Sequence, residues 1–233
     1  MGRGQDRGEN PEAVELSRVK APNTLRFLIA AGPTREFLDP IRYLSNRSSG
    51  KMGYALAEAA MAVSSHVMLI SGPTALKPPE GVEFLSVTTA QEMAEAVWGR
   101  FDAVDVCIMA AAVSDFRPKK TSANKIKKGA FSGMLELEPT PDILAELGRR
   151  KKSQVLIGFA AETDEVEKHA REKLARKGLD FIVANDARAF DAETNRVAII
   201  ASGGEVERLP EMPKSEAAKV IIERAVRLAR SVS

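Results

Sequence analysis

The chain has 233 residues, and 44% of them are hydrophobic, which is enough to form the core of one large α/β domain. Lys and Arg total 34 against 32 Asp and Glu, and aromatic residues make up 5%, so neither charge nor base-stacking residues indicate a nucleic-acid-binding protein. The single cysteine, Cys107, excludes a disulfide within the chain, and we expect it to be a buried core thiol. No apolar run approaches the roughly 18 residues of a membrane span, so we expect a cytoplasmic protein without a membrane partner.

The first residues are polar and lack the apolar centre of a signal peptide. We therefore expect a flexible tail at 1–24 and a single folded domain at 25–233.

Within that domain, apolar runs alternate with amphipathic stretches. In the first half of the chain, the pattern predicts a strand at 24–32, a helix at 51–65, strands at 66–73 and 83–89, a helix at 90–101 and a strand at 105–113. In the second half, it predicts a helix at 140–151, a strand at 154–162, a helix at 164–178, a strand at 180–186, a hairpin at 196–209 and a helix at 214–230. Thr140 is the expected cap of the helix at 140–151, and the hairpin is expected to turn at Gly203–Gly204. Alternating apolar strands and helices are typical of a Rossmann-like, doubly wound α/β fold with a mainly parallel sheet, here with an antiparallel edge hairpin.

The stretch at 117–138 differs from the rest because it is rich in Lys, Ser and Gly and has little periodicity. A long stretch of this kind inside a compact domain is usually a flexible lid or binding loop.

Ligands of open α/β sheets bind at the carboxyl ends of the strands, so the residues after each expected strand are the site candidates. After the first strand, Gly32 would let the backbone approach a ligand, and Thr34 and Arg35 are donors for phosphate. An ordinary turn explains this segment equally well, and the three-glycine fingerprint of dinucleotide-binding proteins is missing.

The segment at 42–53 is the most unusual in the chain. Asn46, Ser48 and Ser49 precede Gly50 at an expected helix start, where backbone N–H groups and the helix dipole favour an anion. Capping of the helix by either serine is the alternative, but it leaves Asn46, the two arginines and Lys51 unexplained.

Two further segments offer polar groups. After the fourth strand, small residues at 110–112 allow a flat ligand to pack closely, and Asp115 is an acceptor for a base, a hydroxyl or a metal-bound water. A turn aspartate is the alternative. The lysines at 125–128 lie in the expected lid and would neutralise phosphates, unless they belong to a solvated basic loop.

These segments together resemble one family. AGPTREFLDPIRYLSNRSSGKMG, MAAAVSDFRP, NKIKKG, TPDILAELG, GFAAET and VANDA occur in the order seen in bacterial phosphopantothenoylcysteine synthetases, and SNRSSGKMG is the most specific of them. The resemblance runs from about Leu25 to the end. In many bacteria this domain is the second half of a bifunctional flavoprotein, and the flavin-binding decarboxylase half has no counterpart in the resemblance, so no FMN is expected.

The resemblance implies a ligase in coenzyme A biosynthesis that uses CTP and Mg²⁺. 4′-Phosphopantothenate attacks the α-phosphate of CTP, pyrophosphate leaves, and the amine of L-cysteine then displaces CMP from the acyl-cytidylate. A homodimer is also implied, as is a separate decarboxylase acting next. By resemblance, Asn46 serves the acyl intermediate and its oxyanion, Lys125 serves the triphosphate, and the nucleotide contacts are Met109, Ala110, Ala111, Asp115, Lys125, Pro141, Asp142, Ile143, Leu144, Phe159, Lys173 and Lys177.

Two of these residues raise a geometric question. Lys173 and Lys177 share a helix face, but Lys173 would lie about 14 Å along a helix that begins near Asp164. Either this helix begins later or crosses the site, or the two lysines lie out of reach. Leu144 is a minor departure from the family pattern.

Two other classes of protein stay open. An NAD(P)-dependent reductase would share the fold, but the Tyr-x-x-x-Lys pair is missing after Tyr43 and Tyr54. A nucleotide-sensing module would bind CTP without releasing pyrophosphate. The sequence leaves CTP and ATP undecided, and it leaves Asp39, Asp115 and Asp142 as alternative metal ligands.

Overall fold

The computed structural model describes residues 24–130, 133–162, 165–186 and 194–232. The predicted tail, apart from Thr24, lies outside these residues. In the part of the chain that is described, no helix is long and apolar enough to cross a bilayer.

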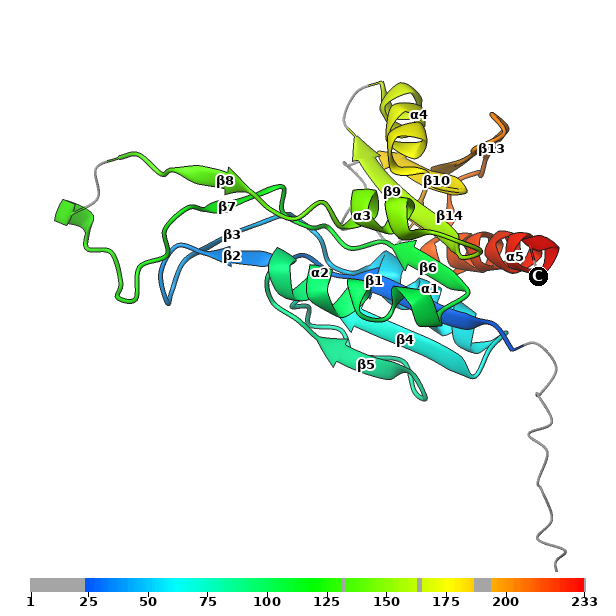
Figure 1. Cartoon of the computed structure of the whole chain (residues 1–233), viewed down its shortest axis with the longest axis horizontal. Helices are drawn as coiled ribbons and strands as arrows, with labels where there is room; N and C mark the ends of the chain where they lie inside the picture. The colour runs from blue at the N-terminus through cyan, green and yellow to red at the C-terminus, as the bar shows by residue number, and fades with distance from the viewer. Residues whose placement is uncertain (1–23, 131–132, 163–164, 187–193, 233) are drawn as a thin grey trace, which may run out of the picture.

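One eight-stranded sheet forms the centre of the molecule (Figure 1). Its order is β13-β12-β10-β9-β6-β1-β4-β5, in which all pairs are parallel except β13-β12 and β12-β10 at one edge. This confirms the mainly parallel sheet and its antiparallel edge. The strands are β1 (Arg26–Ala31), β4 (His66–Ser71), β5 (Glu83–Ser86), β6 (Val106–Met109), β9 (Val155–Glu162), β10 (Phe181–Asp186), β12 (Val197–Ala201) and β13 (Val206–Arg208).

Helices cover both faces of the sheet, because successive side chains of its central strands point to opposite sides. Each face of the sheet therefore has its own hydrophobic core. Phe27 and Ile29 of β1 belong to the first core, on one face, whereas Leu28 and Ala30 belong to the second, on the other face. The first core includes α1 (Lys51–Met61) and α5 (Lys214–Val232), and the second includes α2 (Ala90–Trp98), α3 (Ile143–Arg150) and α4 (Val166–Lys177).

Cys107 lies in the second core with no exposed surface, and burial raises the pKa of its thiol. The thiol is therefore protonated at neutral pH and is a packing group, as the sequence predicted.

Two element boundaries near the strand ends differ from the sequence prediction. The cap of α3 is Asp142, whose side chain accepts from the N–H of Ala145 at 3.1 Å, so the predicted cap at Thr140 is wrong. Thr140 instead donates its hydroxyl to the carbonyl of Ser114 at 2.5 Å. Strand β6 ends at Met109, and the residues after it keep only an isolated bridge between Ala112 and Pro33.

The sequence did not predict an arm that projects from the carboxyl ends of the strands (Figure 1). Two antiparallel pairs form it, β2 (Arg35–Phe37) with β3 (Tyr43–Ser45) and β7 (Phe116–Pro118) with β8 (Leu137–Pro139). The expected lid at 117–138 is thus the outer part of a paired structure, which carries the short 3-10 helix η2 (Lys128–Ala130). A further small pair joins β11 (Thr194–Asn195) to β14 (Met212–Pro213).

Candidate functional site

A cavity of about 470 Å³ lies where the order of the strands reverses. The chain runs outward from β1 to β4 and β5, and then returns to the other side of β1 through β6, β9 and β10. The loops after β1 and β6 therefore diverge, which is the place where open α/β sheets bind ligands. The residues that line the cavity are Asn46, Arg47, Ser48, Ser49, Gly50, Lys51, Met52, Gly53, Ala110, Ala111, Ala112, Val113, Asp115, Phe159, Lys173, Asn185 and Lys214.

The start of α1 forms one wall. Gly50 is its N-cap with φ 78°, a left-handed conformation that suits glycine, and no side chain caps the helix. Capping by Ser48 or Ser49 is therefore not the role of these serines, although the Oγ of Ser48 accepts from the N–H of Gly50 at 3.3 Å. The first turn contains Lys51 and no acidic residue, so the positive helix end at this wall is not neutralised from within the helix.

Asn46 connects this wall to the loop after β6. Its Nδ2 donates to the carbonyl oxygens of Ala112 at 3.3 Å and Val113 at 3.0 Å. Two carbonyl acceptors fix the orientation of the amide and use both of its hydrogens. The group that remains for a ligand is the side-chain oxygen, which is an acceptor.

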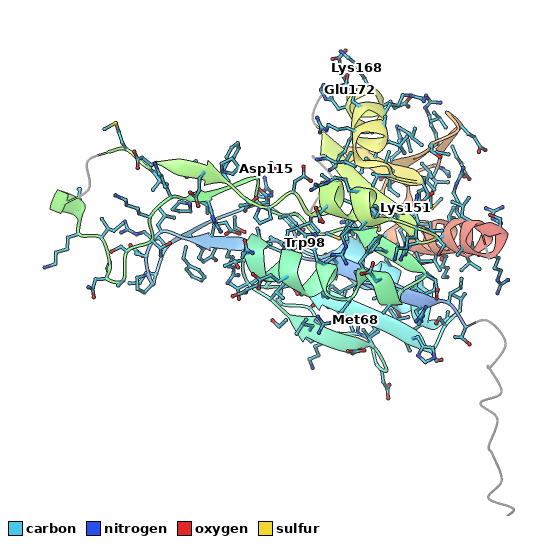
Figure 2. All side chains as sticks on the ribbon, viewed as in Figure 1. Met68, Trp98, Asp115, Lys151, Lys168 and Glu172 are labelled. Atoms are coloured by element: carbon cyan, nitrogen blue, oxygen red, sulfur yellow. The ribbon has the colours of Figure 1, made fainter. Side chains whose placement is uncertain are left out.

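The lining is strongly cationic. It contains Arg47, Lys51, Lys173 and Lys214, against the single carboxylate of Asp115, which lies where the arm meets the body (Figure 2). Four cations around one cavity attract an anion with several charges, because partial burial weakens screening by solvent.

Lys173 reaches the cavity despite its place in the third turn of α4. The helix begins at Val166, and the Nζ of Lys173 donates to the carbonyl of Phe159 in β9 at 2.8 Å. Strand β9 continues past its last pair with β6, Gly158 with Met109, as far as Glu162, and α4 then packs on β9 and β10. The later start and this packing answer the geometric question that the sequence posed for Lys173.

Lys177, on the same face of α4, lies elsewhere. It forms an ion pair with Asp142 at the N-terminus of α3, and its side chain is 10% exposed. Burial raises the pKa of Asp142, but the hydrogen bonds from Lys177 and the Ala145 N–H outweigh it and leave the pKa below the usual range. This pair joins α3 to α4 and does not line the cavity.

The other predicted site residues differ in how far they are buried and in whether they line the cavity. Met109 and Ile143 are each 4% exposed and belong to the core, whereas Pro141 and Leu144 are half-buried at the start of α3. Gly32 packs so tightly that a Cβ there would lie 2.8 Å from the carbonyl oxygen of Gly72. Among the predicted site residues, those that line the cavity are Asn46, Ser48, Ser49, Gly50, Ala110, Ala111, Asp115, Phe159 and Lys173.

Thr34 and Arg35, in the segment after β1, lie next to the cavity but do not line it. Thr34 is fully buried, and its hydroxyl oxygen accepts from the N–H of Ser114 at 3.0 Å. Arg35 lies over the Tyr43 ring at 4.6 Å and lines a neighbouring cavity of about 540 Å³ that shares the loop at 46–49 with the first. Arg35 is thus placed for an anion on the outer side of that loop.

Lys125 does not line the cavity. It is exposed on the arm, one residue before Ile126, which hydrogen-bonds to the β2–β3 hairpin. The same hairpin leads directly from β3 into Asn46, so one element connects Asn46 with the residue that follows Lys125.

Sequence reasoning missed Lys214 and Asn185. Lys214 begins α5 and is 7% exposed, and Asn185 lies near the end of β10. The strand-end rule would have found Asn185, because β10 is parallel to β9 and ends at the same edge. Lys214 follows the short strand β14, which has no apolar run to reveal it.

No group of three or more His, Cys, Asp or Glu in the described ranges is arranged to hold a metal ion. Asp39 is taken by Arg42 and by backbone N–H groups, and Asp142 is taken by Lys177. Asp115 is the only carboxylate among the described residues that line the cavity. Mg²⁺ commonly uses one carboxylate together with substrate phosphates, so this donor set fits a cation that arrives with a polyphosphate.

A doubly wound sheet with a cationic cavity at its switch point defines an α/β protein whose site suits an anionic ligand. The family model described as DNA/pantothenate metabolism flavoprotein C-terminal domain matches residues 23–228. The chain belongs to this family, which confirms the resemblance seen in its motifs.

Relatives agree with this assignment. The chain is 49% identical over 208 residues to the coenzyme A biosynthesis bifunctional protein CoaBC of Bacillus subtilis, covering 87% of this chain and 51% of the relative. It thus spans about half the length of that relative.

Solved structures show the same fold. The C-terminal domain of a coenzyme A biosynthesis bifunctional protein CoaBC aligns with a TM-score of 0.78 at 45% identity, covering 89% of this chain and 96% of that one. A Cab2 variant in complex with phosphopantothenate-cysteine aligns with a TM-score of 0.72 at 19% identity, covering 89% of this chain and 87% of that one. At that identity, the second likeness concerns the fold alone.

Proposed function

We propose that this chain is a phosphopantothenate–cysteine ligase of coenzyme A biosynthesis that uses CTP. The observation that carries the proposal is the cavity in which the uncapped start of α1, the Asn46 loop and four cationic side chains meet. The name of the Bacillus relative supports the pathway, and the family resemblance of the motifs supports the substrates.

The first step needs phosphate recognition more than a nucleophilic side chain. The carboxylate oxygen of 4′-phosphopantothenate attacks the α-phosphate of CTP, the bond to the β-phosphate breaks, and pyrophosphate leaves with the electron pair. Lys51, Lys173 and Lys214 lower the barrier by stabilising the negative charge that grows on the leaving group. Mg²⁺ held through Asp115 and the phosphates would supply further positive charge.

In the second step, the amine of cysteine attacks the acyl carbon, and CMP leaves. The Nδ2 of Asn46 donates to the carbonyls of Ala112 and Val113, so the side-chain oxygen is the group placed to accept a hydrogen bond from an N–H of that amine. This arrangement favours orientation of the nucleophile over donation to the oxyanion, the role that the resemblance implied. Donors for the oxyanion are the backbone N–H groups at the start of α1.

A homodimer is part of the proposal because the arm exposes apolar side chains that its own subunit does not cover. Exposure is 60% for Ile41, 55% for Phe116 and 46% for Leu137. Apolar groups gathered on one projection are typical of an interaction surface. The family resemblance of the motifs also leads us to propose that a separate decarboxylase acts on the product.

Pyrophosphate release tests the function. The protein is mixed with 4′-phosphopantothenate and one of four nucleoside triphosphates, with and without cysteine. We expect release with CTP, and amide product only when cysteine is present. Release with ATP alone would revise the nucleotide, and binding of CTP without release would make the chain a nucleotide-binding module.

A further inference from the structure

The carboxylate of Asp39 is completely buried in the arm, at the turn between β2 and β3. Its Oδ1 accepts from the backbone N–H groups of Ile41 and Arg42, both at 2.9 Å. The backbone also closes this turn, because the Leu38 N–H donates to the Arg42 carbonyl at 2.8 Å. One oxygen of Asp39 therefore completes the local turn.

The second oxygen has a different set of partners. Oδ2 accepts from Nε of Arg42 at 3.0 Å, from its Nη2 at 2.5 Å, and from the N–H of Ile126 at 3.1 Å. The same Nη2 of Arg42 donates to the carbonyl of Ile126 at 2.8 Å. Asp39 and Arg42 thus bind both polar groups of one residue that is 87 positions from Asp39 in the sequence.

This clamp on Ile126 is one of three attachments between the segment around Lys125 and the hairpin. The other two precede Lys125, where the N–H of Ser122 donates to the carbonyl of Leu38 at 2.9 Å and the hydroxyl of Thr121 donates to the carbonyl of Phe37 at 3.1 Å. Consecutive Cα atoms are about 3.8 Å apart, so the backbone of Lys125 lies next to the clamp while its side chain is exposed. The hairpin therefore determines where the ammonium group of Lys125 can act.

We propose that Asp39 is a positioning residue for the first step of the reaction, and that it acts through Arg42 and Ile126 on Lys125. This inference rests on the proposed ligase function and on the contact with the triphosphate that the family resemblance implies for Lys125. Asp39 touches no substrate in this scheme. Its place in the clamp also explains why it is unsuited to hold a metal ion.

The alternative is that Asp39 only keeps the arm folded. A double-mutant cycle with Lys125→Ala separates the two, because a purely structural contribution adds to the loss of Lys125, whereas a positioning contribution vanishes once Lys125 is gone. Asp39→Asn is the variant to use. It keeps the size of the side chain, but its amide has one acceptor oxygen and cannot serve both sets of donors.

The measurements are kcat/KM for pyrophosphate release and hydrogen exchange at the Ile126 amide. We expect Asp39→Asn to lower kcat/KM about tenfold to a hundredfold, the size that a small displacement of a reacting group produces. The double variant should be no slower than Lys125→Ala alone, and the Ile126 amide should lose protection in Asp39→Asn.

Asp105→Asn is the matched control. Asp105 accepts from the N–H of Arg26 at 2.7 Å and from its guanidinium at 3.2 Å, but it lies just before β6, at the amino ends of the strands. The pair has similar chemistry and no contact with the arm, so kcat/KM should not change. If Asp39→Asn does not fold, Arg42→Lys replaces it, because lysine keeps the charge but lacks the fork that joins Asp39 to Ile126.

Additive losses in the cycle would overturn the proposal, as would full protection of the Ile126 amide in Asp39→Asn. An unchanged kcat/KM in Lys125→Ala would also overturn it. The ligase function would survive that result if the unaltered protein still forms pyrophosphate and amide, so the two failures are distinguishable.

Discussion

Asn46 is held by two backbone carbonyls, and this makes its replacement informative. In Asn46→Asp, a carboxylate oxygen would face the carbonyls of Ala112 and Val113, where the amide now donates at 3.3 and 3.0 Å. Repulsion should turn the side chain away and remove the acceptor for the amine. We expect amide formation to slow about a hundredfold or more, and pyrophosphate release to slow much less.

Single-turnover measurements of both steps test this expectation. A control is Ser45→Ala, at the residue before Asn46. It removes a 2.7 Å hydrogen bond to the Thr34 carbonyl and should affect both steps equally, if at all. Equal loss of the two steps in Asn46→Asp would contradict the assignment of Asn46 to the second.

Acid should weaken the fold through a few aspartates. Hydrogen bonds from Arg42 hold the pKa of Asp39 well below its usual range. Burial raises the pKa of Asp105, but the hydrogen bonds from Arg26 leave it lowered as well. A lowered pKa stabilises the folded state above the unfolded value of about 3.9, and this contribution is lost as the pH falls through the folded value.

Urea unfolding at pH 7 and at successively lower pH therefore should show a falling free energy of unfolding below about pH 4. Asp105→Asn should fall less steeply, since it lacks one of these carboxylates. A free energy of unfolding that stays constant down to the lowest pH would contradict this account.

Residues near strand ends could be predicted as site candidates because topology alone places them. Asp115 was predicted by this logic and Asn46 by its place before an expected helix start, whereas Phe159 came from the family resemblance alone. All three line the cavity. The arm could not be predicted in this way. Its short strands have no long apolar run, and contacts between residues as far apart as Asp39 and Ile126 leave no local pattern in the sequence.

At the scale of elements, the contact between α1 and β1 positions the cavity. A Cβ at Gly53 would lie 2.4 Å from the Cβ of Ala31, so the helix approaches the strand as closely as glycine allows. Gly53→Ala should push the start of α1 outward and destabilise the protein by about 1–3 kcal/mol. Chemical denaturation measures the loss, and CTP binding should weaken in parallel.

Gly129→Ala is the control, because nothing lies within 4 Å of a Cβ at that position. It should leave the free energy of unfolding within about 0.5 kcal/mol of the original. A Gly53→Ala protein as stable as this control would mean that α1 moves aside without cost.

Helix α4 shows where an element could not be placed from the sequence. Its end was predicted at 178, and Gly178 is the left-handed C-cap. Periodicity gives the apolar face of a helix but not the elements that the rest of the helix contacts. The packing of α4 against β9 and α3 brings Lys173 to the cavity and Lys177 to Asp142.

At the scale of the whole molecule, the arm supports the proposed homodimer. Among the described apolar side chains of the arm, Ile41 is the most exposed after Met134. Ile41→Asp would place a charge where a second subunit would bury this side chain. We expect monomers by sedimentation and a lower ligase activity, with the stability of the sheet unchanged. Phe84→Asp, 42% exposed on the distant edge strand β5, is the control and should stay dimeric.

The strands of the sheet are also shared between the two parts of the chain that flank the arm. β6 precedes the outer arm and pairs with β9, which follows it, and α1 packs against α5 across the same division. A single proteolytic cut at the far end of the arm would therefore yield two fragments that remain one particle. One fragment would retain β7 and the other β8, so a cut there would loosen the outer arm while the sheet stays assembled.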